Sequence, residues 1–147
     1  MKIKDILDTS RGLITASVDQ KVSEALKTLI LNKISCLPVI DSNGDLKGII
    51  SERDLLREIN ENPNGFSVRK VSEVMSHNIL IGLIDDDLDY VMNIMSQNNI
   101  RHMPVMSGQN LTGIISIRDV VKGLMHKVTA ENRYLKDYIE GKYEGYQ

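Results

Sequence analysis

The chain is poor in the residues that mark several classes of protein. It has one cysteine, Cys36, no tryptophan and a single phenylalanine among 147 residues. A single cysteine excludes an intrachain disulfide, and a lone thiol is typical of proteins in a reducing compartment. With so few aromatic side chains, the core has to be built from isoleucine, leucine, valine and methionine.

Long apolar runs and an excess of one charge are also missing. No run approaches the roughly 20 apolar residues needed to cross a bilayer, and the N-terminal MKIKDILDTS lacks the apolar core of a signal peptide. The formal net charge is −2 with both signs spread along the chain, so there is no basic stripe for nucleic acid or membrane. We therefore expect a soluble, cytoplasmic protein that binds neither nucleic acid nor membrane.

Motifs of enzymes and metal sites do not occur in the sequence either. His77, His102 and His126 are scattered without zinc spacing, and no nucleophile elbow or glycine-rich phosphate loop is found. The acidic DDDLD (85–89) lacks the glycine and final glutamate of a calcium loop. We expect no enzymatic activity and no required metal.

What the sequence does contain is an internal repeat. GIISERD (48–54) returns as GIISIRD (113–119) with one difference in seven positions. At an offset of 66 residues, VDQKVSEALKTLILNKISCLPVI (18–40) aligns with IDDDLDYVMNIMSQNNIRHMPVM (84–106). Each half has about 60 residues, which is too few to bury a good core alone. The two halves are therefore expected to pack on each other.

The same elements are predicted in each half. Apolar residues at helical spacing predict a helix that Asp19 can cap, and its counterpart in the second copy. CLPVID and HMPVM are typical of strands, the Asn-Gly of SNGD predicts a hairpin, and LKGIIS and LTGIIS are the returning strands. Further helices are expected to begin at Ser51 and Ser116. The short first strands are predicted at LIT (13–15) and ILI (79–81).

This repeated strand-helix-strand-strand-helix pattern, with PV on the first hairpin strand and G-h-h-S-x-R-D (h apolar) opening the last helix, resembles a tandem pair of CBS domains. The resemblance implies an α+β fold in which two pseudo-twofold-related CBS (β-α-β-β-α) repeats pack into one module. The predicted segments are repeat 1 (2–60), a linker (61–70), repeat 2 (71–126) and a C-terminal helical tail (127–147).

The resemblance also implies a class of ligand. CBS pairs bind adenosine derivatives in the clefts between their repeats, and their usual role is sensing. It therefore implies a regulatory sensor of an adenosine nucleotide, AMP first, with ADP, ATP, NAD(H) or S-adenosylmethionine as alternatives. It implies a homodimer as well. The other interpretation is a ligand-free scaffold that dimerises or docks an unidentified client protein.

Two interpretations of the repeated S-x-R-D phrase use the same atoms. As structure, Ser51 with Asp54 and Ser116 with Asp119 are close to capping boxes. As function, a helix N-terminus suits a phosphate, and a carboxylate in its first turn can accept from both hydroxyls of a ribose. By the resemblance, the two aspartates bind ribose and the two serines lie beside them.

Basic residues distinguish the two halves. Arg53 and Arg118 recur inside the phrase and are candidates for phosphate or interface contacts. Before the proline, the first copy reads ISCLP and the second IRHMP, so Arg101 and His102 match a basic pair that often faces phosphate in nucleotide-binding CBS pairs. His102 is alternatively a strand residue at the interface. We expect one stronger cleft, on the Arg101 side, and one weaker or empty cleft.

An adenine base needs an apolar slot, and its candidates lie in the first strand of each half and around PV. For each of them, a place in the core is an equal interpretation. They are Thr15, Ile34, Leu37, Ile81, Ile100, Met103 and Pro104.

The end of the chain is rich in tyrosine. Its four tyrosines are Tyr134, Tyr138, Tyr143 and Tyr146. Leu135 and Ile139 are one helical turn apart. A short helix with such apolar groups needs a surface to pack on. We expect it to dock on a partner subunit or on a client protein.

Overall fold

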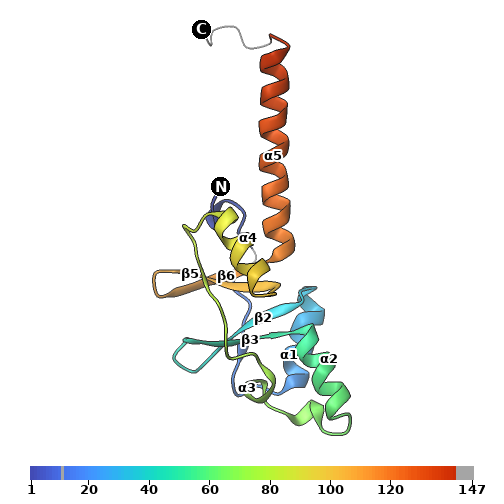
Figure 1. Cartoon of the computed structure of the whole chain (residues 1–147). Helices are drawn as coiled ribbons and strands as arrows, with labels where there is room; N and C mark the ends of the chain where they lie inside the picture. The colour runs from blue at the N-terminus through green and yellow to red at the C-terminus, as the bar shows by residue number, and fades with distance from the viewer. Residues whose placement is uncertain (11, 142–147) are drawn as a thin grey trace.

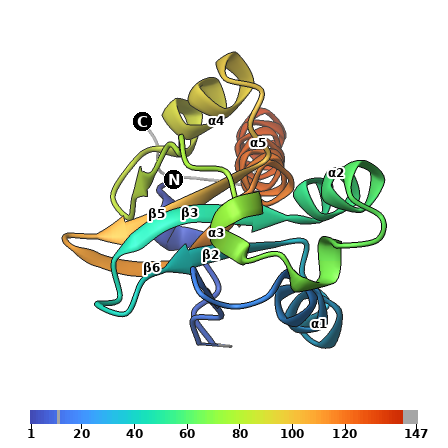
Figure 2. The ribbon, with the colours of Figure 1, turned by 90° about the horizontal axis from the view of Figure 1, so that it is seen from below.

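Two three-stranded sheets lie one above the other in the computed structural model, which describes residues 1–10 and 12–141 (Figure 1). Helices cover the outer side of each sheet, as the view from below also shows (Figure 2). Tyr143 and Tyr146 lie outside the described residues.

The first repeat forms the lower sheet in Figure 1. β1 (Ala16–Ser17) runs parallel to β2 (Cys36–Ile40), and β2 pairs antiparallel with β3 (Leu46–Ser51). α1 (Val22–Asn32) connects β1 to β2, and α2 (Glu52–Glu61) follows β3 directly. The predicted hairpin at Asn-Gly is confirmed, because Gly44 takes the left-handed conformation (φ 82°) that glycine permits.

The second repeat copies this arrangement. β4 (Gly82–Leu83) runs parallel to β5 (His102–Ser107), which pairs antiparallel with β6 (Asn110–Ser116). α4 (Leu88–Gln97) connects β4 to β5, and α5 (Ile117–Ile139) follows β6. The predicted α+β fold with two repeats and a C-terminal helix is confirmed.

The short helical segment that precedes the strands of each repeat packs against the core of the other repeat. Ile3, in the 3-10 helix η1 (Ile3–Asp5), is buried in the core of the second repeat with Leu88 and Val105. The segment after the 3-10 helix η2 (Phe66–Val68), namely α3 (Val71–Val74), contributes Val71 to the core of the first repeat. The two repeats are therefore tied together by exchange as well as by packing. Both cores are aliphatic and contain methionine, as predicted.

Two local predictions are wrong. The short first strands were expected at 13–15 and 79–81 but lie at 16–17 and 82–83. Pairing begins only there, between Ala16 and Val39 and between Gly82 and Val105. Asp19 does not cap α1; the first helical N–H, of Val22, donates instead to the Arg69 carbonyl oxygen at 2.8 Å.

The helical tail expected at 127–147 continues the last helix of the second repeat in the described residues. α5 is one continuous helix of 23 residues from the S-x-R-D phrase to Ile139, and its outer part rises clear of the sheets (Figure 1). Gly123 lets this helix approach α4, because a Cβ there would lie 2.9 Å from Leu88 Cδ1. None of the described helices is both long and apolar enough to span a membrane.

Candidate functional site

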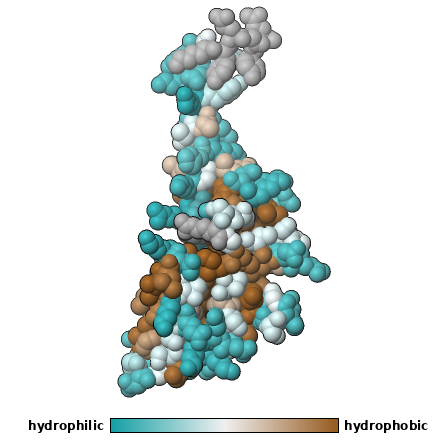
Figure 3. All heavy atoms as spheres, turned by 180° about the vertical axis from the view of Figure 1, so that it is seen from behind, coloured by the Kyte–Doolittle hydropathy of each residue, from teal (hydrophilic) through white to brown (hydrophobic). Residues whose placement is uncertain are grey.

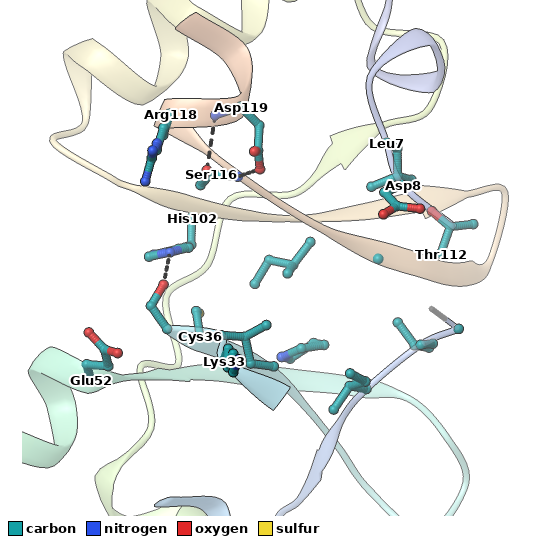
Figure 4. Close-up of a pocket in the computed structure, with 18 of the residues that line it drawn as sticks. Leu7, Asp8, Lys33, Cys36, Glu52, His102, Thr112, Ser116, Arg118 and Asp119 are labelled. Atoms are coloured by element: carbon teal, nitrogen blue, oxygen red, sulfur yellow. Dashed lines mark hydrogen bonds between the residues drawn. The ribbon is translucent and has the colours of Figure 1, made fainter. Parts of the chain in front are cut away.

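A cleft of about 890 Å³ lies between the repeats. One wall comes from β6 and the first turns of α5, and the opposite wall from β2 and the turn that precedes it. The segment 12–14 and the turn after η1 close one end (Figure 4). Both repeats are therefore needed to form it.

Asp119 stands in this cleft with one carboxylate oxygen held and the other open. Its Oδ2 accepts from the Ser116 backbone N–H at 3.0 Å, while its own N–H donates to Ser116 Oγ at 3.1 Å. This is the predicted capping box, which is confirmed. The side chain is exposed, and Oδ1 has no hydrogen-bond partner among the described residues. A ligand can therefore reach a carboxylate whose orientation is already set.

Cations gather beside Asp119. Arg118 and Lys122 lie on the first turns of α5, line the cleft and are exposed. The free N–H groups of the helix start add a partial positive charge at the same place. Lys33 reaches the cleft from the C-terminal end of α1, while Glu52 supplies an acid from the first turn of α2. The end near α5 is thus suited to an anionic group.

His102 links the two walls of the cleft. It lies opposite Ser116 in the β5–β6 ladder, and its Nε2 shares a 2.9 Å hydrogen bond with Ser35 Oγ of the first repeat (Figure 4). Burial lowers the pKa of His102 below its usual value; Asp119 opposes this shift and Arg101 adds to it. The imidazole is therefore neutral at neutral pH.

The first copy of the S-x-R-D phrase forms the same cap, but its aspartate is buried. Asp54 is only 6% exposed, and its Oδ2 accepts from both the N–H and the hydroxyl of Ser51, at 2.8 and 3.1 Å. Its Oδ1 lies 3.6 Å from Arg57 Nη1. Both carboxylate oxygens are therefore engaged within the protein, and Asp54 does not line the cleft.

A backbone segment pairs with the outer edge of β3. Ser76 exchanges two backbone hydrogen bonds with Ile49, at 2.8 and 3.1 Å, and so occupies the edge of this strand that β2 leaves free. The approach is so close that a Cβ on Gly48 would lie 2.5 Å from the Ser76 carbonyl oxygen. At the equivalent Gly113 of β6, the nearest atom is Cδ1 of the flexible Leu7 side chain, at 3.1 Å.

The structure brings together only part of the predicted ligand set. The predicted residues that line the cleft are Ile34, His102, Ser116, Arg118 and Asp119. Those that do not are Thr15, Leu37, Ser51, Arg53, Asp54, Ile81, Ile100, Arg101, Met103 and Pro104.

The residues outside the cleft have other surroundings. Met103 and Ile100 pack in or against the second core, Leu37 in the first, and Ile81 borders a smaller pocket of about 360 Å³ near the hairpins. Arg101 is exposed at the end of its strand. Arg101 does not line the cleft of about 890 Å³, whereas Ser35, at the equivalent position of the first repeat, does. The stronger cleft expected on the Arg101 side stays a prediction.

Several lining residues had no signal in the sequence. Lys33, for example, follows α1 in a left-handed turn (φ 54°). Leu13 and Ile14 also line the cleft and belong to the LIT segment, the candidate for the base, although this segment is irregular rather than a strand. Lys122 could have been found, because it lies four residues after Arg118 on one helix face.

Cys36 occupies the position in the first repeat that His102 occupies in the second. Burial raises the pKa of its thiol to about 12, so it stays protonated at neutral pH. Among the described residues, no cluster of three or more histidine, cysteine or acidic side chains is arranged to hold a metal ion. In the DDDLD stretch, Asp85 pairs with Lys4 at 3.0 Å and Asp86 accepts from the Leu83 N–H at 2.8 Å.

The sequence profile of the CBS domain family matches this chain twice, over residues 3–61 and 71–126. A curated relative is the mitochondrial CBS domain-containing protein CBSX3 of Arabidopsis thaliana, 30% identical over 131 residues, which cover 86% of this chain and 64% of that protein. Two other curated relatives are longer enzymes, of which the matching part makes up 22% and 24%.

Solved structures show the same fold. The CBS-domain containing protein ATU1752 of Agrobacterium tumefaciens is 36% identical with a TM-score of 0.76, covering 82% of this chain and 91% of that one. The CBS domain pair of protein MJ0100, in complex with 5′-methylthioadenosine and S-adenosyl-L-methionine, is 31% identical with a TM-score of 0.76, covering 86% and 98%. CBSX2 in complex with AMP is 26% identical with a TM-score of 0.72, covering 85% and 96%.

Proposed function

Since the chain belongs to the CBS domain family, we propose that it is a regulatory protein that binds an adenosine nucleotide, AMP first, in the cleft at Asp119. The observation that carries this proposal is the Asp119 carboxylate, which its cap fixes at Oδ2 and leaves open at Oδ1. Support comes from two similar structures, which were solved with AMP and with S-adenosyl-L-methionine and 5′-methylthioadenosine.

In the proposed complex, Asp119 accepts from the ribose hydroxyls. Charge-assisted hydrogen bonds of this kind are the stronger ones, at about 1.5–3 kcal/mol each. The phosphate lies at the start of α5, where Arg118 and Lys122 neutralise its charge. The base lies between apolar side chains of both repeats, chiefly Ile14, Ile34 and Ile114.

The charges of the cleft favour a small anion. The lining cations Lys33, Arg118 and Lys122 are balanced by the lining acids Asp8, Glu52 and Asp119, so a monophosphate suits the cleft better than a triphosphate. ADP, ATP and NAD(H) are the alternatives. In this proposal, the protein acts in the cytoplasm as a homodimer, has no catalytic activity of its own and needs no metal to bind the nucleotide.

A thermal-shift screen tests the proposal against the ligand-free scaffold. The melting temperature is measured with AMP, ADP, ATP, NAD+, NADH, S-adenosylmethionine and GTP. A ligand that binds only the folded state raises it by mass action. We expect the largest rise with AMP and none with GTP. A chain that responds to none of these ligands would favour the scaffold for a client protein.

A further inference from the structure

An exposed apolar stripe runs along α5. Its members are Val121 (40% exposed), Met125 (61%), Val128 (50%), Leu135 (55%) and Ile139 (81%). Together with Asn132, they are spaced alternately by four and three residues over the described helix. This spacing is the a/d pattern of a coiled coil, with Met125, Asn132 and Ile139 at a and Val121, Val128 and Leu135 at d.

The body of the protein does not cover this stripe. α5 packs on α4 through another face, on which Val120 and Gly123 are buried and Lys127 pairs with Asp89 at 3.9 Å. At 3.6 residues per turn, the stripe lies roughly a quarter of a turn from that face. Beyond Lys127 the helix projects from the body, and pale and light-brown side chains lie among the hydrophilic ones along it (Figures 1 and 3).

Asn132 specifies what kind of helix can pair with this stripe. In a parallel pair of identical helices, each a residue faces its own counterpart, so the two Asn132 amides can hydrogen-bond to each other. In an antiparallel pair, a faces d, and Asn132 would meet apolar side chains and leave its amide unpaired. A single asparagine at a therefore favours a second copy of α5 in parallel register.

The flanking charges agree with this choice. Glu131 takes a g position and Lys136 the following e position, which face each other across a parallel two-stranded coiled coil. Neither side chain forms an ion pair within the described chain. Two identical helices would thus contribute two Glu131–Lys136 pairs, one on each side of the seam.

We propose that α5 pairs in parallel with α5 of a second copy and forms a short two-stranded coiled coil. The proposal rests on the proposed homodimer and assigns a surface to it. The part of α5 beyond Lys127, residues 128–139, is short enough to be marginal in water as an isolated helix, so the pairing needs the folded bodies to hold the bases of both helices together. It does not depend on the bound nucleotide.

Cysteine cross-linking of the full chain tests the register. Under mild oxidation, Val128→Cys and Leu135→Cys should each give a disulfide-linked dimer, because like d positions meet in a parallel pair. Ala130→Cys, which points outward, and the wild type with its buried Cys36 should not. Cross-linking at only one of the two d positions would indicate a crossed or antiparallel pair and overturn the proposal.

Sedimentation velocity separates this pairing from the homodimer itself. Leu135→Lys should weaken the dimer at least tenfold, whereas Ala130→Lys should leave it unchanged. A wild-type dimer that is unaffected by Leu135→Lys and is not cross-linked at 128 or 135 would keep the homodimer and reject the coiled coil. A wild type that is monomeric at all concentrations would reject both the homodimer and the coiled coil. AMP binding is measured separately on each variant, so that a failure of the nucleotide site is distinguished from a failure of the pairing.

Discussion

The two copies of S-x-R-D form the same cap and end in opposite surroundings. Asp119 is exposed beside the large cleft, whereas Asp54 is buried between Ser51 and Arg57. The local structure is nearly identical, with a serine at the N-cap and an aspartate three residues later in both. The S-x-R-D sequence alone therefore determines the helix cap, whereas the segments that pack beside it determine whether a ligand can reach the aspartate.

The difference in front of the two phrases comes from the exchanged segments. In the first repeat, Ser76 forms two backbone hydrogen bonds to Ile49 at the edge of the strand that leads to Asp54, close against Gly48. In the second repeat, the side chain of Leu7 is the nearest group to Gly113, and the wall remains part of the cleft. We therefore expect one nucleotide site per chain.

The largest predicted effect is on stability. In Gly48→Ala, the new methyl group would overlap the Ser76 carbonyl oxygen, so the 75–76 segment has to leave β3. We expect the free energy of unfolding to fall by about 2–4 kcal/mol. Denaturant unfolding measures it.

Gly113→Ala is the matched control for Gly48→Ala. There the methyl group meets only the movable end of Leu7, so the loss should stay below about 1 kcal/mol. Equal losses in the two variants would mean that the segment at Ser76 does not distinguish the two halves.

The second prediction concerns the cations. Arg118→Met and Lys122→Met should each weaken AMP about five- to twentyfold, or roughly 1–2 kcal/mol, through loss of the phosphate contact. Adenosine, which has no phosphate, should bind both variants as it binds the wild type. Isothermal titration calorimetry measures both ligands.

Arg53→Met and Arg57→Met are the equivalent changes in the first repeat. They should leave the AMP affinity within about twofold, although Arg57→Met removes the partner of Asp54 and costs some stability. Weaker AMP binding in these variants would place phosphate in the closed half.

The smallest effect depends on pH. The unfolded chain takes up a proton on His102 near pH 6.5, whereas burial lowers the pKa in the folded chain. This contribution to stability is therefore present above about pH 6.5 and is lost as the pH falls towards the folded-state pKa. His102→Gln should lose less stability than the wild type between pH 7.5 and 5.5.

Cys36, at the equivalent position, has a pKa of about 12 and adds no such dependence in this range. Unfolding curves at both pH values measure the effect. The same slope in wild type and His102→Gln would show that another group is responsible.

The repeat, the hairpins and both caps could be predicted from the sequence because they depend on local spacing. The cleft could be predicted only in part. Arg101 matched a basic pattern but is exposed outside the cleft, while Lys33 and Lys122 line it. Which copy stays open depends on Ser76 and Leu7, which reach their strands from distant parts of the chain. No pattern near Asp54 or Asp119 records those contacts.

Calorimetric titration with AMP tests the proposal of a single site at Asp119. We expect one AMP per chain, with binding at least tenfold weaker in Asp119→Ala and changed less than about threefold in Asp54→Ala, provided that both variants are folded by circular dichroism. Two AMP molecules per chain, or loss of binding in Asp54→Ala with binding retained in Asp119→Ala, would contradict it.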